Sequence, residues 1–170
     1  MANVEAFDIL KRSGKVAFYG VPSKEGEYTY HRMKGFTTLS TEKNPKEYSR
    51  QYVDEESERT DVVGYNTSIS FGFDRAKGNA AHEDLVSIFD DEKIGAAAIR
   101  PIVIVDFENA TDAGAKAVKR MFSVIPSSEG DGTDAYTYSG TFKTAGDKQS
   151  GIAESDDEWQ TITFTEGSGE

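Results

Sequence analysis

Apolar and polar residues alternate along several short segments of the chain, and this period of two is typical of half-buried β-strands. In the segment 65–73, the apolar positions on one face are Ile69, Phe71 and Phe73. The small residues on the opposite face are Ser68, Ser70 and Gly72. By this pattern the predicted strands cover residues 15–21, 28–39, 46–53, 65–73, 99–107, 117–125, 135–144 and 158–165.

One segment, residues 80–92, has its apolar residues at helical spacing instead. Leu85, Ile88 and Phe89 fall on one side of a helix whose other side carries acids. Asn79 precedes the segment and is a suitable N-cap, because its side chain can accept a hydrogen bond from a free amide of the first turn. The sequence therefore predicts a helix that covers an apolar surface.

Two details refine the predicted strands. Gly35 interrupts the alternation within residues 28–39, and we interpret it as a β-bulge. The run 102–105 is apolar at every position. A strand of this kind is expected to be covered on both faces.

A strongly acidic segment, residues 54–64, separates the predicted strands 46–53 and 65–73. Its acids are Asp54, Glu55, Glu56, Glu58 and Asp61, against a single base. So many charges leave little apolar surface to bury, so we expect a mobile loop that joins the two strands as a hairpin and becomes ordered when subunits stack.

These elements together predict an all-β fold: a β-sandwich or small barrel with one α-helix and a long hairpin with an acidic loop. The 170 residues are enough for one core, and we expect a single domain, 1–170. Residues 1–14 would form an N-terminal arm. The polar, glycine-rich end, 166–170, would be a flexible tail.

Charge and composition exclude several function classes. The formal net charge is −11, which disfavours a protein that grips DNA through its phosphates, because such proteins need lysine and arginine. Cysteine is absent, so thiol catalysis, disulfides and thiolate metal sites are excluded. No apolar run approaches the ~20 residues that cross a bilayer, so we expect no membrane insertion.

The sequence offers few groups for catalysis. His31 and His82 stand alone, and the surroundings of His82 lack the second histidine of a zinc-binding helix. The segment 131–134 (DGTD) lacks the spacing of a calcium loop and is interpreted as a turn. Trp159 is interpreted as a core or interface anchor. We therefore expect no catalytic residue, cofactor or metal site.

The order of elements and the C-terminal third of the chain resemble the major tail tube proteins of long-tailed bacteriophages. The likeness is carried by YSGTFK at 138–143, the turn at Gly146, Ile152 and the closing strand 159–165. It implies hexameric rings that stack into a tube through which DNA passes during ejection. It also implies tape-measure, tail-terminator and distal tail proteins as partners, and a place in the virion tail after synthesis in the host bacterial cytoplasm.

Within this interpretation, the hairpin and its loop are the candidate assembly residues: Tyr48, Tyr52, Asp54, Glu55, Glu56, Glu58, Asp61, Ile69, Phe71 and Phe73. The candidates for the channel wall are Ser68, Ser70 and Gly72. A wall of small polar residues in an acidic protein would let DNA pass without adhesion.

Three alternatives stay open. The chain could be a tube subunit of a contractile tail-like or type VI particle. It could also be a carbohydrate- or peptide-binding module that uses tyrosines we expect to be exposed: Tyr28, Tyr30, Tyr48, Tyr52, Tyr65, Tyr136 and Tyr138. A hydrolase based on two carboxylates would need a paired acid with a shifted pKa in a cleft.

Overall fold

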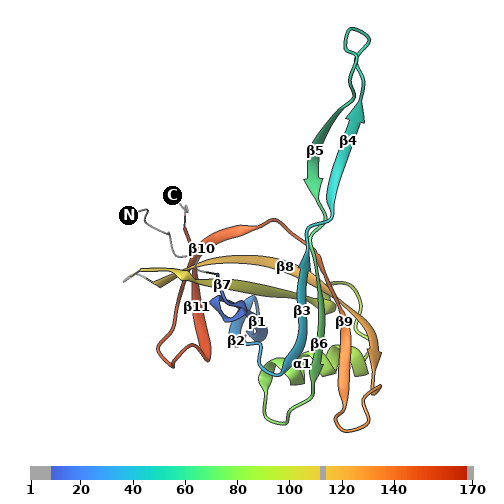
Figure 1. Cartoon of the computed structure of the whole chain (residues 1–170). Helices are drawn as coiled ribbons and strands as arrows, with labels where there is room; N and C mark the ends of the chain where they lie inside the picture. Colours follow the sequence, from blue (N-terminus) through green and yellow to red (C-terminus); the bar gives the residue numbers. More distant parts are fainter. Residues whose placement is uncertain (1–8, 112–113, 168–170) are drawn as a thin grey trace, which may run out of the picture.

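The computed structural model describes residues 9–111 and 114–167 (Figure 1). Its strands are β1 (Lys15–Lys24), β2 (Glu27–Arg32), β3 (Phe36–Glu42), β4 (Pro45–Arg50), β5 (Arg59–Tyr65), β6 (Ser68–Asp74), β7 (Ile99–Thr111), β8 (Gly114–Glu129), β9 (Thr137–Thr144), β10 (Gln149–Glu154) and β11 (Thr161–Glu166). The helix α1 spans Ala80–Asp90, and the short 3₁₀ turns are η1 (Arg12–Gly14) and η2 (Gly95–Ala98). The predicted all-β fold with one α-helix is confirmed for the described residues, and a long hairpin is present with a pairing that differs from the predicted one. The proposed N-terminal arm and flexible tail fall largely on residues 1–8 and 168–170, which lie outside the described ranges.

A closed barrel forms one half of the fold. Its strands run in the order β10, β11, β2, β1, β7 and β8, and pairing of β8 with β10 closes the ring. The interior is filled by buried apolar side chains, among them Phe18, Val103, Val105 and Ile162. Trp159 packs against this core, and its ring lies edge-to-face on the Phe107 ring with the two ring centroids 5.0 Å apart.

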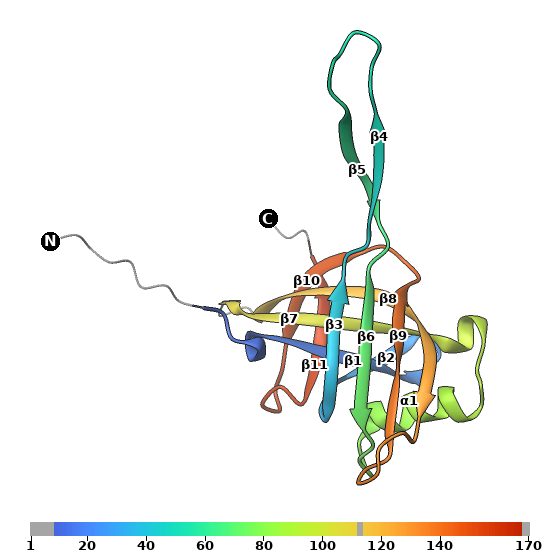
Figure 2. The same ribbon diagram turned by 45° about the vertical axis from the view of Figure 1, so that its right-hand side comes forward.

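The other half extends the same sheet from β8 through β9 and β6 to β3 (Figure 2). This extension and α1 enclose a second core against the outside of the barrel, with Phe71, Phe142 and Leu85 fully buried. Strand β7 separates the two cores. Ile102 belongs to the second core and Val103 to the barrel core, so the prediction that residues 102–105 are covered on both faces is confirmed.

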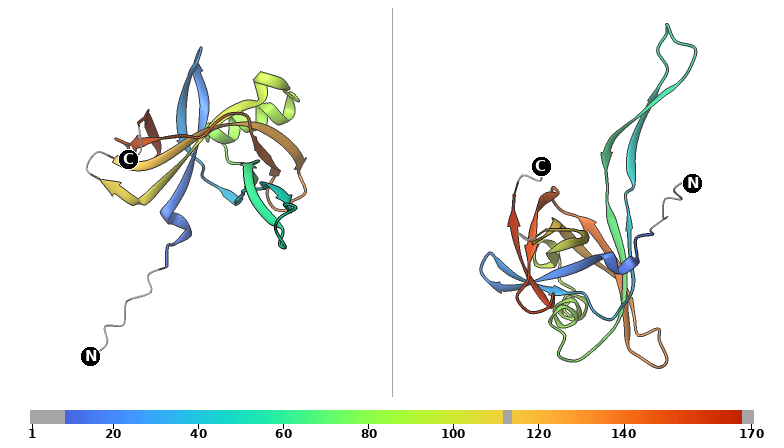
Figure 3. Two further views of the ribbon diagram at one scale, coloured as in Figure 1. Left: turned by 90° about the horizontal axis from the view of Figure 1, so that it is seen from above. Right: turned by 60° about the vertical axis from the view of Figure 1, so that its left-hand side comes forward.

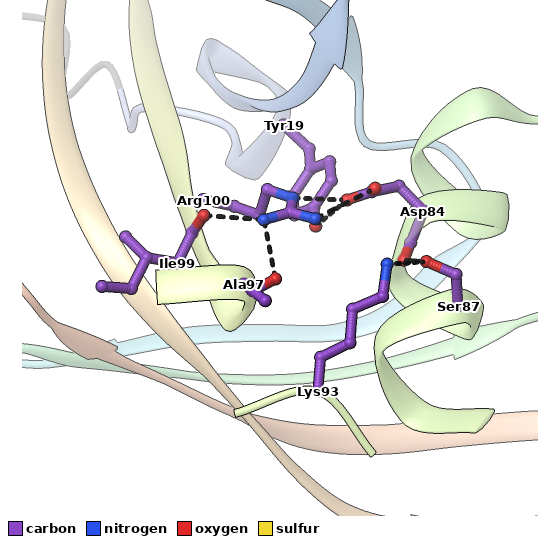
Figure 4. A network of polar contacts seen from close by, with 7 residues as sticks. All are labelled: Tyr19, Asp84, Ser87, Lys93, Ala97, Ile99 and Arg100. Carbon is purple, nitrogen blue, oxygen red and sulfur yellow. Dashed lines mark hydrogen bonds and ion pairs between the residues drawn. The ribbon is translucent and has the colours of Figure 1, made fainter. Parts of the chain in front are cut away.

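Buried polar contacts fix α1 to the barrel (Figure 4). Asp84 of α1 accepts hydrogen bonds from Arg100 Nε at 2.8 Å and from the Tyr19 hydroxyl at 2.5 Å. Arg100 Nη1 also donates to the carbonyls of Ala97 and Ile99. The predicted N-cap is confirmed, because the Asn79 side chain accepts from the amide of His82.

The pairing of the hairpin differs from the prediction. Strand β4 pairs with β5, from Pro45 opposite Tyr65 to Arg50 opposite Arg59, whereas β6 pairs with β3 and β9. The predicted hairpin of 46–53 with 65–73 is therefore wrong, and so is the assignment of 59–64 to a mobile loop. The β-branched residues of β5 favour a strand, and Arg50 and Arg59 offset the charge of Asp61.

Two further boundaries also differ. Residues 28–39 form two strands, β2 and β3, because Gly35 has a φ of 75° and turns the chain between them instead of forming a bulge within one strand. Strand β11 begins at Thr161 instead of residue 158. Residues 155–160 form a turn in which Asp157 accepts hydrogen bonds from the amides of Gln160 and Thr161. Strand β10 was not predicted.

Candidate assembly surfaces

The outer face of the strands β3, β6, β9 and β8 is lined with small side chains that mostly carry hydroxyl groups. In β6, Ile69, Phe71 and Phe73 point into the core with at most 2% exposure, so the intervening residues point outward. Cross-strand register adds more hydroxyl groups to this face, in the rows Ser40–Ser70–Thr141–Ile125 and Thr38–Gly72–Ser139–Ser128. We call this surface the hydroxyl face.

The structure brings the three candidate wall residues together on the hydroxyl face. Ser70 is half-buried, whereas Ser68 and Gly72 are buried already in the single chain. Ser68 accepts a hydrogen bond from the side-chain amide of Asn44, and Gly72 lies beneath Thr38. Sequence reasoning missed Thr38, Ser40, Ser139 and Thr141, because only the register shows that these residues share the face.

The motif at 138–143 serves packing. Gly140 stands opposite Phe71, and a Cβ at this position would come within 2.9 Å of the Phe71 ring and 2.5 Å of the Ile125 carbonyl oxygen. Phe142 stacks on Phe71 with ring centroids 4.2 Å apart. Because the glycine lets the ring lie flat against β9, the motif holds the hydroxyl face onto the second core.

The second candidate surface is a ribbon that projects from the body (Figures 1 and 2). It continues the β3–β6 pair into β4 and β5, and we call residues 45–65 the arm. At its base Asn44 has a φ of 44°, and its carbonyl accepts from the amide of Asn66. Figure 3 shows that the arm stands clear of both the barrel and α1.

Most arm side chains are exposed. The large apolar ones are Tyr48, Tyr52, Val53, Val62, Val63 and Tyr65, each at least 45% exposed. Arg50 forms an ion pair with Asp61 at 2.5 Å and lies over the rings of Tyr48 and Tyr52. Its hydrogen bond lowers the pKa of Asp61. A two-stranded ribbon is only marginally stable in water, and exposed apolar side chains often mark an interaction site, so the arm is a candidate contact surface.

The groups considered for catalysis have structural roles. His82 is buried; its Nδ1 accepts from the amide of Ala76, and its Nε2 donates to the carbonyl of Lys34 at 2.6 Å. Burial lowers its pKa, so the ring is neutral. His31 is half-buried in β2, and desolvation lowers its pKa too. Across the described ranges, no cluster of His, Cys, Asp or Glu side chains could hold a metal ion.

Two acids outside the Asp84–Arg100 ion pair have clear roles in turns. Hydrogen bonds from Thr161, and then from Ser155, lower the pKa of Asp157 to about 2. Asp131, in the segment 131–134, accepts a hydrogen bond from the Thr137 hydroxyl at 2.6 Å. The lowered pKa of Asp157 is the opposite of the raised pKa that the general acid of a hydrolase requires.

The tyrosines do not form one continuous binding surface. Tyr30 and Tyr138 are buried in the two cores, which corrects the expectation that they are exposed. Tyr48, Tyr52 and Tyr65 are exposed, but all three lie on the arm. No helix within residues 9–111 and 114–167 has both the length and the apolar character needed to cross a bilayer.

Comparison with known proteins gives a likeness of fold. No family model and no curated protein matches the sequence. A solved structure of the tail of an empty GTA particle, computed with helical refinement and C6 symmetry, matches with a TM-score of 0.52 at 13% identity, over 82% of this chain and 97% of that chain. The sheath/tube terminator structure of a PVC extracellular contractile injection system matches with a TM-score of 0.47 at 13% identity, over 85% of this chain and 99% of that chain. The chain therefore shares the fold of a particle-tail protein, as the sequence resemblance implied.

Proposed function

We propose that this protein is the structural subunit of a phage tail tube, in which hexameric rings stack to form a conduit for DNA. The observation that carries the proposal is the hydroxyl face. It is a broad sheet surface with small polar side chains, and it ends at the edge strand β3, which within the described residues pairs with β6 alone. An open sheet edge is normally covered or paired.

Ring closure would cover that edge. If neighbouring copies place their sheets side by side, the hydroxyl faces form the inner wall of a closed barrel and every copy is equivalent. Ser68, Ser70 and Gly72 would then belong to the wall. The six-fold symmetry of the GTA tail, which shares this fold, supports a ring of six.

The charge of the wall suits the passage of DNA. Glu42 and Lys143 both pair with Ser68, on opposite sides, so they lie two strands apart, or about 10 Å. Their charges offset each other, and Asp74, the next outward residue of β6 after Gly72, adds one exposed acid to the hydroxyl face. Without a concentration of cations, the wall offers few phosphate contacts that would slow DNA.

The arm would join one ring to the next. The assembly residues assigned from the sequence divide between two roles: Tyr48, Tyr52, Asp54, Glu55, Glu56, Glu58 and Asp61 lie on the arm, whereas Ile69, Phe71 and Phe73 hold the wall to the core. The ends of the tube would meet the tail-terminator and distal tail proteins. The channel would hold the tape-measure protein before DNA enters, and the particle would assemble in the host bacterium.

Cysteine labelling tests the wall directly, because the chain has no native cysteine. We expect a maleimide attached to a polymer coil wider than the channel to label Ser70→Cys in dispersed subunits but not in assembled tubes, since this reagent cannot enter the channel. Glu25→Cys, in the turn after β1, is the matched control and should label equally in both states. Equal labelling of Ser70→Cys in both states would contradict the wall assignment.

Electron microscopy with negative stain tests the assembly itself. Concentrated protein should show rings or tubes with a central channel, and sedimentation should show a matching concentration dependence. A chain that stays monomeric at every concentration would favour a binding module instead.

A further inference from the structure

A groove of about 810 Å³ opens between the outside of the barrel and the β3 end of the sheet. Its floor is apolar and includes Ile69, Ile102 and Phe122. Its rim is basic, with the cations Lys11, Arg12, Lys15, Lys43, Arg120 and Lys148. No Asp or Glu is among its described lining residues, although the chain carries a net charge of −11.

The cations of the groove have no acidic partner among the described residues. None of the six forms an ion pair within the described ranges. Arg12 donates to the carbonyls of Lys15 and Leu39, which are neutral acceptors. The Nε of Arg120 is buried and has no hydrogen-bond partner. A buried donor without a partner is costly, so the groove is suited to an acidic ligand with an apolar part.

The tip of the arm has this chemistry. Residues 51–58 (QYVDEESE) contain four acids and no base. Among them stands Val53, whose side chain is fully exposed at 108%. The tip thus carries an apolar residue flanked by carboxylates, which matches an apolar floor with a basic rim.

The tip cannot reach the groove of its own chain. The groove lies at the base of the arm, where Lys43 and Thr67 line it. Strand β4 alone carries the chain about 20 Å from that base at ~3.4 Å per residue, and the arm points away from the body (Figure 3). The occupant must therefore come from a second copy.

We propose that the acidic arm tip of one subunit docks in the basic groove of another subunit. This inference rests on the proposed tube function and names the receptor of the arm. A tip-to-base contact joins two different surfaces, so each copy still offers one free tip and one free groove. Where no rotation closes it into a ring, such a heterologous contact propagates along one direction, as a stack of rings requires.

Charge reversal tests the pairing. Lys43→Glu with Lys148→Glu changes two exposed rim residues, and Glu55→Lys with Glu56→Lys changes the tip. We expect either pair alone to weaken polymerisation about tenfold or more, and the combination of both pairs to restore most of it. Lys24→Glu with Lys116→Glu, at exposed sites outside the groove, is the matched control and should have little effect.

Disulfide trapping locates the contact. Val53→Cys on one subunit and Thr41→Cys, beside the groove, on another should form a mixed disulfide under mild oxidation of assembled protein, whereas Val53→Cys with Glu25→Cys should not. The docking proposal would be overturned, while the tube function stands, by two results together: tubes form but Val53→Cys and Thr41→Cys make no disulfide, and the charge reversals do not weaken polymerisation. Absence of tubes from the unmodified chain would overturn the function itself.

A polyanion is the other occupant that the groove chemistry would allow. Fluorescence anisotropy with a short labelled oligonucleotide distinguishes the two occupants. If the protein binds the oligonucleotide and Lys43→Glu with Lys148→Glu removes this binding, the groove is assigned to nucleic acid and the docking proposal is overturned. We expect no such binding at physiological salt, where the acidic surface repels the probe.

Discussion

Replacing Asp84 by alanine should destabilise the subunit by about 3 kcal/mol. The Asp84 and Arg100 side chains are only 12% and 8% exposed, and removal of one partner from a buried ion pair typically costs about 3–5 kcal/mol. We expect a cost at the lower end of this range, because Arg100 Nη1 keeps the carbonyls of Ala97 and Ile99 as hydrogen-bond acceptors. The Tyr19 hydroxyl loses its acceptor as well.

Urea unfolding followed by the fluorescence of Trp159, the single tryptophan, measures this loss. Trp159 packs on the barrel core, whereas Asp84 lies in α1, so a shifted midpoint would report the whole domain. A loss of about 3 kcal/mol would lower Tm by roughly 6–12 °C for a chain of this size. Lys93→Met is the matched control and should cost under about 0.5 kcal/mol, because it removes one 3.3 Å contact to Ser87.

The double replacement Asp84→Leu with Arg100→Met separates two explanations. If the cost of Asp84→Ala comes from an uncompensated buried charge, the double variant should be more stable than the single one, since neither charge remains. A loss below about 1 kcal/mol for Asp84→Ala, or a double variant that is less stable than the single one, would refute the reasoning.

Three further outcomes are expected. Phe71→Ala should cost about 3–5 kcal/mol in urea unfolding, because it empties the centre of a stacked aromatic core, whereas Phe71→Asp should prevent folding or ring formation. Lowering the pH from about 4 to 2 should loosen the turn at 155–160: Asp157 has its pKa depressed to about 2, so its stabilising effect is present above the ordinary value of 3.8 and is lost as the pH falls through 2. In the Asp157→Asn variant, this acid-dependent loosening of the turn at 155–160, followed by amide exchange, should be absent. Gel-shift titration should show no binding of double-stranded DNA at physiological salt, and tight binding that weakens steeply with salt would contradict the conduit.

Local patterns predicted the elements that bury a face. The alternation in residues 69–73 correctly placed the three apolar side chains in the core, and the spacing of Leu85, Ile88 and Phe89 located α1. Both signals arise from burial, which the sequence records residue by residue. These patterns can therefore be recognised without knowing which strands pair with each other.

Pairing was not predictable in the same way. Strand β5 is rich in charge near its start and buries almost nothing, so its composition resembles a loop. It is a strand because β4 lies opposite, and the β3–β6 pair at its base sets the register. The basic groove was also missed, because its cations come from positions as distant as Lys11 and Lys148 and meet only in the folded chain.

The division of the chain into a packed body and an exposed arm separates folding from assembly. The two cores, α1 and its ion pair supply the burial that stabilises the subunit, whereas residues 51–58 are exposed and lie outside both cores. Deleting residues 51–58 and closing β4 to β5 with a short turn should therefore leave the unfolding midpoint nearly unchanged while it abolishes polymerisation.

Amide exchange gives the matching readout in the unmodified chain. Protection of these residues should be absent in dispersed subunits and appear in tubes, and equal protection in both states would show that the tip has no partner.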